Sequence, residues 1–150
     1  MDGHKMSKEN DSLKLSNQLC FPLYAASKEV VRKYKPLLDP LGLTYTQYIT
    51  MMVMWEHKTL NVKEIGKYLF LDSGTLTPVL KKLEEKGYVV RNRSKDDERN
   101  LDVSITEEGE ALKSAAEGLP EKLSSSIDFS TEDAAQLYSL LYKLLDSLSI

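Results

Sequence analysis

The sequence is poor in the residues that cross-link small proteins or hold structural metals. It contains one cysteine, Cys20, and two histidines, His4 and His57. A single cysteine excludes a disulfide within one chain, and these three residues make a poor ligand set for a metal. We therefore expect no metal site, no cofactor and a reducing, cytoplasmic location.

Long apolar runs are also missing. No stretch approaches the ~20 apolar residues that a membrane span needs, and no signal-peptide pattern precedes the first helical segment. The chain has 150 residues, of which 29% are charged. These values predict a single domain, residues 1–150, without membrane association.

The segment from Asn61 to Thr106 has the strongest pattern. Asn61 with Glu64 predicts a helix start, and residues 71–74 (Leu-Asp-Ser-Gly) predict a turn. Gly87 suits the end of a second helix, in which Pro78 predicts a local distortion or a later start. Apolar residues recur at helical spacing in both halves, at Val62, Ile65, Leu69 and Phe70 and then at Leu76, Val79, Leu80 and Leu83.

Two strands are predicted after this helix pair. Residues 88–93 and 101–105 have the composition and alternation of strands, and the polar residues 94–100 between them predict a projecting wing. Helix, turn, helix and hairpin in this order are typical of a winged helix-turn-helix, which reads duplex DNA. We expect a mainly α fold with a small β-hairpin wing, with residues 44–106 as the DNA-binding part.

Positive charge is concentrated in the same segment. From Pro78 to Lys95 there are six Lys/Arg and two Glu, a balance of +4, whereas the whole chain carries −3 and the remainder therefore −7. A solvated helix and hairpin would explain the charge alone, but the helix-turn-helix order favours a polyanion partner. The polar face of the second helix carries groups suited to base edges and phosphates: Ser73, Thr75, Thr77, Lys81 and Lys82.

The regions on both sides of this segment have helical apolar patterns. The first predicts a helix from Leu15 to Leu37 within residues 13–38. Prolines 36 and 40, on either side of residues 37–39, predict a tight corner or a single turn there. Thr44 and Gln47 form a capping-box pattern for a helix through Glu56, with a core of Ile49, Met52, Val53 and Trp55. A helix that starts at Thr106 should end near residues 124–126. Ser130 should cap the last helix, whose apolar stripe consists of Leu137, Leu140, Leu141, Leu144, Leu145 and Leu148.

The terminal stripes are wide for a small domain. Packing within one chain is one explanation. The other, which we favour, is a homodimer joined through residues 13–38 and 107–150.

Cys20 allows two interpretations. A free cysteine is most often a small buried apolar residue. However, Pro22 is most comfortable in the first turn of a helix, where unpaired backbone donors and the helix dipole stabilise a thiolate.

Two groups of motifs resemble the MarR family of bacterial repressors. One comprises residues 71–78 (Leu-Asp-Ser-Gly-Thr-Leu-Thr-Pro), residues 81–84 and the basic and acidic run from Arg91 to Arg99. The other, residues 19–25 around Cys20, is similar to its organic-hydroperoxide-sensing branch (OhrR), although Pro22 departs from that pattern. The resemblance covers roughly Leu13 to Leu148. It implies a winged helix-turn-helix repressor that binds a pseudo-palindromic operator.

The resemblance also implies roles for single residues. Asp72, Thr75 and Lys82 of the recognition helix would contact DNA, Arg91 would contact its backbone, and Arg99 would enter the minor groove with Asp97 orienting it. Arg93 is a further candidate DNA-binding residue. Lys82 stands where the family often has arginine. Lysine lacks the paired N–H donors of arginine, so a bidentate contact is not expected from Lys82. Cys20 would be the peroxide-reactive thiol, with Tyr34 and Tyr45 donating hydrogen bonds to its thiolate across the dimer.

The implied switch starts with attack of the Cys20 thiolate on an organic hydroperoxide, which forms a sulfenic acid and releases the operator. The sulfenic acid would be captured by a low-molecular-weight thiol, by another molecule's Cys20 or by further peroxide.

Three alternative functions would be distinguished by different tests. A phenol-responsive regulator would respond without Cys20, a thiol peroxidase would turn over peroxide, and a structural DNA-binding protein would respond to neither. No catalytic constellation accompanies Cys20, so we expect no enzyme.

Overall fold

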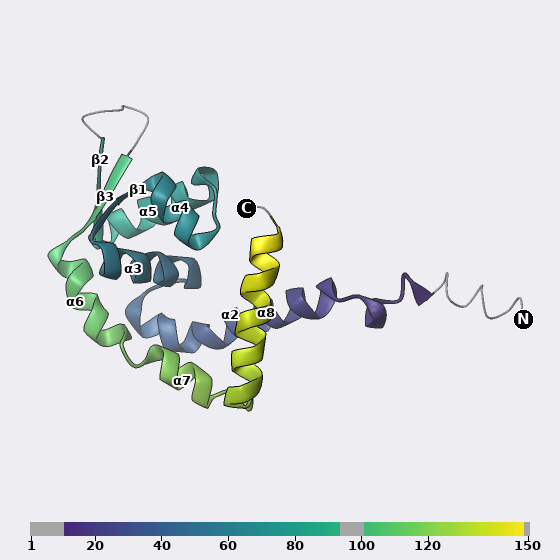
Figure 1. The fold of residues 1–150 in the computed structure, drawn as a ribbon. Helices are drawn as coiled ribbons and strands as arrows, with labels where there is room; N and C mark the ends of the chain where they lie inside the picture. The colour runs from purple at the N-terminus through teal and green to yellow at the C-terminus, as the bar shows by residue number, and fades with distance from the viewer. Residues whose placement is uncertain (1–10, 94–100, 149–150) are drawn as a thin grey trace, which may run out of the picture. The chain divides into compact units, whose positions relative to one another are not determined.

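The computed structural model describes residues 11–93 and 101–148. It comprises two compact units, Met1–Lys35 and Pro36–Ile150, and Figure 1 labels their elements. The described part is mostly helical with one small antiparallel sheet, which confirms the predicted fold class. The predicted single-domain boundaries stay a prediction.

The first long helix, α2 (Cys20–Leu38), begins later than the apolar pattern predicted, so the start at Leu15 is wrong. A 3-10 turn, η1 (Leu15–Asn17), precedes it. Pro22 is the third residue of α2, where a backbone N–H has no partner within the helix, so the proline costs little there. The chain turns slightly later than the corner or single turn predicted at residues 37–39, because the turn begins at Asp39. The helix continues through Pro36 to Leu38, because a proline this near the end removes a single hydrogen bond.

After the turn η2 (Asp39–Leu41), helix α3 (Tyr45–His57) forms the centre of the second unit. Thr44 and Gln47 close the predicted capping box. The core prediction was partly wrong, because Met52 is 44% exposed while Tyr48, Met51 and Met54 are buried. Helix α3 contacts α4, α5, α6 and the sheet, so more than one of its faces is covered.

The helix-turn-helix consists of α4 (Val62–Leu69) and α5 (Ser73–Glu85). The Asn61 side chain accepts the Glu64 N–H at 2.8 Å and starts α4. Phe70 takes the left-handed conformation with φ 56°, which ends α4 and turns the chain. Gly87, with φ 83°, follows the end of α5 as predicted, since glycine carries no Cβ to clash there.

The sheet has the strand order β1-β3-β2 and is antiparallel throughout. Strands β2 (Val89–Arg93) and β3 (Leu101–Ile105) confirm the predicted hairpin and run side by side away from the helices in Figure 1. The third strand, β1 (Thr59–Asn61), was not predicted. It pairs Leu60 with Val103, which places a strand between the two helices α3 and α4 in sequence.

A buried tryptophan connects α3 to the next helix, α6 (Glu107–Ala116). The Trp55 Nε1–H donates to the Gly109 carbonyl at 2.8 Å. Gly109 has no space for a larger residue, because an added Cβ would collide with the Tyr88 carbonyl oxygen. Helix α6 is thereby held against both α3 and the start of the hairpin.

The C-terminal part contains two further helices, α7 (Leu119–Ser125) and α8 (Thr131–Ser147). The single helix predicted from Thr106 is divided, because Gly118 and Pro120 stand where α7 begins. Ser130 caps α8 by accepting the Asp133 N–H at 3.0 Å, as predicted. Among the described residues, no helix has the length and apolar content to cross a membrane.

Candidate nucleic-acid interface and thiol site

Helix α5 has two clearly different faces. Leu76, Leu80 and Leu83 are fully buried and attach the helix to the core. The opposite face is exposed and carries the predicted DNA-binding residues Ser73, Thr75, Thr77, Lys81 and Lys82. The structure therefore brings these five side chains together on one helix, where its polar face is open to a partner.

Asp72 caps the start of α5. Its Oδ1 accepts the Thr75 N–H at 2.7 Å and caps the helix. The pKa of Asp72 is lowered, chiefly by that backbone hydrogen bond and then by the Thr75 hydroxyl. The carboxylate is therefore anionic at neutral pH, and its contact with DNA stays a prediction.

Pro78 does not delay the start of α5. The helix begins at Ser73 and is continuous through Pro78 to Glu85, so the predicted later start is wrong. The buried leucines on both sides of Pro78 fix the helix, and tertiary packing outweighs the missing hydrogen bond.

Arg91 is held by a carboxylate of the recognition helix. Glu84 Oε2 accepts the Arg91 backbone N–H at 2.8 Å, and Oε1 accepts from Nη2 at 3.1 Å and from Nε at 3.3 Å. These bonds lower the pKa of Glu84, with the backbone bond as the largest cause. The pair connects α5 to β2 and fixes the hairpin relative to the recognition helix.

The other predicted cations are placed differently. Arg93 is exposed at the end of β2. Lys82 lies 3.6 Å from Glu85 in an exposed ion pair. Asp97 and Arg99, the predicted wing residues, lie outside the described residues.

Cys20 is exposed and is the first residue of α2. Its sequence neighbours Leu19, Phe21 and Tyr24 are exposed as well. Within one chain, Cys20 is therefore not a buried core residue. Over residues 11–93 and 101–148, no cluster of three or more His, Cys, Asp or Glu is arranged to hold a metal.

Tyr34 lies on the same helix as Cys20 and is half-buried. The two residues are 14 positions apart, which corresponds to about 21 Å along a helix at 1.5 Å per residue. This distance is beyond the reach of a tyrosine side chain. A hydrogen bond from Tyr34 to a Cys20 thiolate therefore requires the two residues to come from different chains.

Tyr45 opens α3, directly after the capping residue Thr44. Burial raises the pKa of Tyr45, so its phenol stays protonated at neutral pH and is able to donate a hydrogen bond. Its ring lies 6.4 Å from that of Tyr48, whose own pKa is raised chiefly by burial. The thiolate-supporting role of both Tyr34 and Tyr45 stays a prediction.

One connection had no signal in the sequence. The Lys86 ammonium at the end of α5 donates to Gln47 Oε1 at 2.9 Å and to the Gly42 carbonyl oxygen. Gln47 is 7% exposed and also accepts the Thr44 N–H. The end of the recognition helix is thus connected to the capping box beside Tyr45. The partners are 39 and 44 residues away in sequence, too far for pattern analysis.

Two helices with a short turn, a polar recognition face and a three-stranded sheet define a winged helix-turn-helix, the fold of a class of transcriptional regulators. Comparison with known proteins agrees. The sequence profile of the transcriptional regulators SarA/Rot matches residues 32–116. The organic hydroperoxide resistance transcriptional regulator of Bacillus subtilis (strain 168) is 50% identical over 143 residues, which is 95% of this chain and 97% of the relative.

Solved structures are similar over nearly the whole chain. A structure of reduced AbfR bound to DNA has a TM-score of 0.79 and 31% identity, covering 94% of this chain and 96% of that one. A structure of disulfide-formed AbfR has a TM-score of 0.61 and 33% identity, covering 95% and 97%. The chain belongs to the MarR family of transcriptional regulators, in the branch of the organic hydroperoxide resistance regulators.

Proposed function

We propose that this protein is a homodimeric transcriptional repressor that binds operator DNA and releases it when an organic hydroperoxide oxidises Cys20. The observation that carries the proposal is the exposed thiol at the first position of α2. It occurs in a chain that is half identical to an organic hydroperoxide resistance regulator. AbfR, which has a similar fold, has been solved reduced and bound to DNA and also in a disulfide-formed state.

The dimer is supported by two apolar helix surfaces. Helix α2 exposes Leu23, Val30 and Val31, and α8 has no buried residue. The exposed large side chains of α8 are Leu137, Tyr138, Leu140, Tyr142 and Leu144, and Leu148, which caps its end, is exposed as well. Apolar stripes of this length favour burial against a second copy. The 21 Å between Cys20 and Tyr34 gives the dimer a role in sensing, since only the partner's Tyr34 is then able to approach the thiol.

DNA is bound by the exposed face of α5. Two such helices in a two-fold dimer enter successive major grooves about 34 Å apart, so the operator is a pseudo-palindrome. Thr75 and Lys82 face base edges and phosphates, together with Ser73, Thr77 and Lys81. Asp72 orients this face by capping α5, and Arg91 contacts the backbone from its fixed position beside Glu84.

The protein detects the hydroperoxide through a single oxidation, that of Cys20. The Cys20 thiolate attacks the terminal oxygen of the hydroperoxide, the O–O bond breaks, and the alkoxide leaves and takes a proton to become the alcohol. The sulfur becomes a sulfenic acid and accepts hydrogen bonds differently from a thiolate. The tyrosine contacts then rearrange, and the two recognition helices lose their spacing. A low-molecular-weight thiol, a second molecule's Cys20 or further peroxide completes the reaction.

The test compares wild type with Cys20→Ser in binding to a duplex selected from random DNA. Each protein is measured with and without an organic hydroperoxide and a small thiol. We expect wild type to lose about a thousandfold in affinity, equivalent to ~4 kcal/mol, and the serine variant to keep its affinity. Equal loss in both proteins would refute Cys20 as the sensor and favour the ligand-responsive rival. Absence of any selected duplex would refute DNA binding itself.

A further inference from the structure

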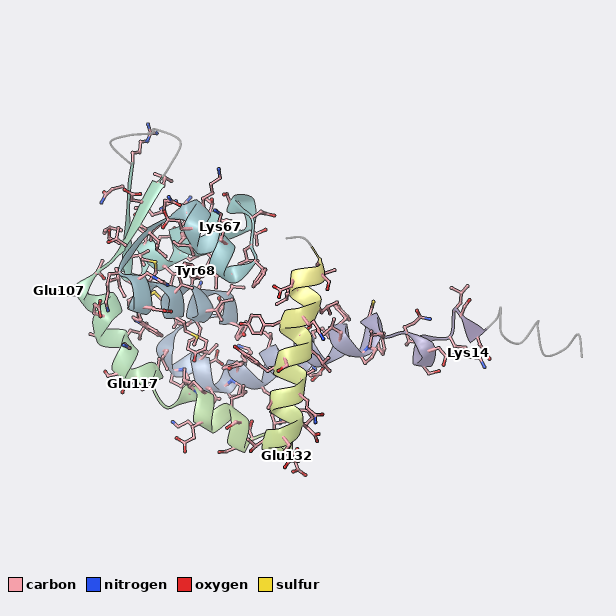
Figure 2. The ribbon with its side chains drawn as sticks, in the orientation of Figure 1. Lys14, Lys67, Tyr68, Glu107, Glu117 and Glu132 are labelled. Atoms are coloured by element: carbon pink, nitrogen blue, oxygen red, sulfur yellow. The ribbon has the colours of Figure 1, made fainter. Side chains whose placement is uncertain are left out.

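A hollow of about 530 Å³ opens beside the start of the recognition helix. It is lined by residues of α4, of the turn and of the first position of α5: Lys63, Gly66, Lys67, Phe70, Leu71, Asp72 and Ser73. Figure 2 marks Lys67 on α4. None of the residues of α4 was among the predicted DNA contacts.

The hollow has a rigid wall formed by the turn. The Leu71 N–H donates to the Gly66 carbonyl at 3.0 Å, and a Cβ on Gly66 would lie 2.5 Å from the Leu71 carbonyl oxygen. This close approach requires glycine at position 66. The turn therefore lies directly against α4 and forms one side of the hollow.

Two cations stand on one side of this hollow. Lys63 and Lys67 are four residues apart on α4, so they lie on the same face of the helix. Both are exposed, and neither joins an ion pair among the described residues. In contrast, the predicted phosphate-binding residues Lys82 and Arg91 already face Glu85 and Glu84.

The chemistry of the lining favours a phosphate oxyanion. Two ammonium groups and the Ser73 hydroxyl supply donors, and Oδ1 of the anionic Asp72 carboxylate in the lining accepts the Thr75 N–H. The net charge of the lining is +1, from two lysines and one aspartate. An anion with a single negative charge, such as one phosphodiester, balances it.

We propose that Lys63 and Lys67 bind a backbone phosphate of the operator in this hollow. The inference rests on the proposed DNA-binding function. In a helix-turn-helix the second helix enters the major groove and the first crosses the sugar-phosphate backbone, which is where α4 carries these lysines. A phosphate contact of this kind fixes the register of α5 without reading a base.

The test measures affinity against salt concentration for Lys67→Gln and for the double variant Lys63→Gln/Lys67→Gln. Each phosphate contact adds about 0.9 to the slope of log affinity against log salt, and a dimer has two copies of each lysine. The two lysines share one phosphate in each subunit, so we expect the slope to fall by about 2 for the double variant and by less for the single variant, in which Lys63 still faces that phosphate. Affinity for the operator and for random duplex should fall by the same factor, because no base is read.

Lys122→Gln is the matched control, since it removes the same charge from α7, outside the helix-turn-helix. Thermal unfolding and sedimentation establish that all variants remain folded and associate as wild type does. A double variant with the wild-type slope would overturn the assignment of this phosphate site. Failure of wild type to bind any duplex would instead overturn the proposed function.

A free anion has the same chemistry as a backbone phosphate, so inorganic phosphate is titrated separately. The amide resonances of Gly66 and Ser73 report binding. The proposal is supported if phosphate binding needs both lysines and if the double variant also has a smaller DNA salt slope than wild type. Phosphate binding with an unchanged DNA slope would overturn it and assign the hollow to a free anion.

Discussion

Replacement of Glu84 by glutamine should release the hairpin from the recognition helix. The carboxylate accepts three hydrogen bonds from Arg91, of which the shortest, 2.8 Å, comes from the backbone N–H. Glutamine keeps one carbonyl oxygen, so it accepts either the backbone or the guanidinium but not both. The NH2 group of the glutamine, itself a donor, would also face an N–H donor of Arg91.

The expected cost follows from the exposure of the pair. The Arg91 and Glu84 side chains are 20% and 36% exposed, so solvent screening limits the ion pair to under ~1 kcal/mol. The lost charge-assisted bond to the backbone adds about 1 kcal/mol. We expect Glu84→Gln to lower the free energy of unfolding by ~1–2 kcal/mol at neutral pH.

The effect should depend on pH with a defined sign. The folded-state pKa of Glu84 is below its usual value of 4.5, so the carboxylate stabilises the fold above that pH and loses its effect as pH falls through the folded pKa. The difference between wild type and Glu84→Gln should therefore be largest near pH 7 and shrink below pH 4.5. Urea unfolding followed by circular dichroism, at one protomer concentration, measures this.

Glu85→Gln is the matched control for stability. Among the described residues its carboxylate forms a single ion pair, the exposed 3.6 Å pair with Lys82, so its loss should cost less than ~0.5 kcal/mol. Glu85→Gln also frees the Lys82 ammonium, a proposed DNA contact, so the two variants are compared in stability and in its pH dependence and not in DNA affinity. Equal destabilisation by the two variants, or a cost for Glu84→Gln that is the same at pH 3.5 and pH 7, would refute the reasoning.

Two further variants test the core and the cap. Trp55→Phe should cost ~2–3 kcal/mol in urea unfolding, because a buried hydrogen bond to Gly109 and part of the ring volume are lost; a cost below ~0.5 kcal/mol would contradict this contact. Asp72→Ala should lower the midpoint of urea unfolding, because the Thr75 N–H loses its cap, whereas Asp72→Asn should restore the stability. If asparagine restores stability but not DNA affinity, the carboxylate contributes to binding beyond the cap; if alanine is as stable as wild type, the cap is not stabilising.

The sequence alone was sufficient where the physics is local. The capping patterns at Thr44 and Ser130 involve residues three positions apart, and both form as predicted. The Asn61 cap and the buried leucines of α5 follow the same short-range rules. The exposed recognition face could be predicted for the same reason, since a helix repeats every 3.6 residues.

Tertiary structure decided the features that join distant residues. Strand β1 has three residues and no detectable period, and it exists because Leu60 pairs with Val103 across the sheet. The exposure of Met52 could not be predicted, because several elements surround α3 and together determine which of its faces are buried. Likewise, Glu84 had no visible partner in the sequence until the hairpin placed Arg91 beside it.

The functional site likewise has features that follow from the sequence and features that depend on tertiary structure. The residue types on α5 and the position of Cys20 within its motif could be identified from the chain, because each belongs to one continuous segment. The hollow between α4 and α5 could not, since it depends on how closely the turn at Leu71 approaches Gly66. Residue patterns describe which side a helix presents, whereas the distance between two helices is determined by the side chains packed between them.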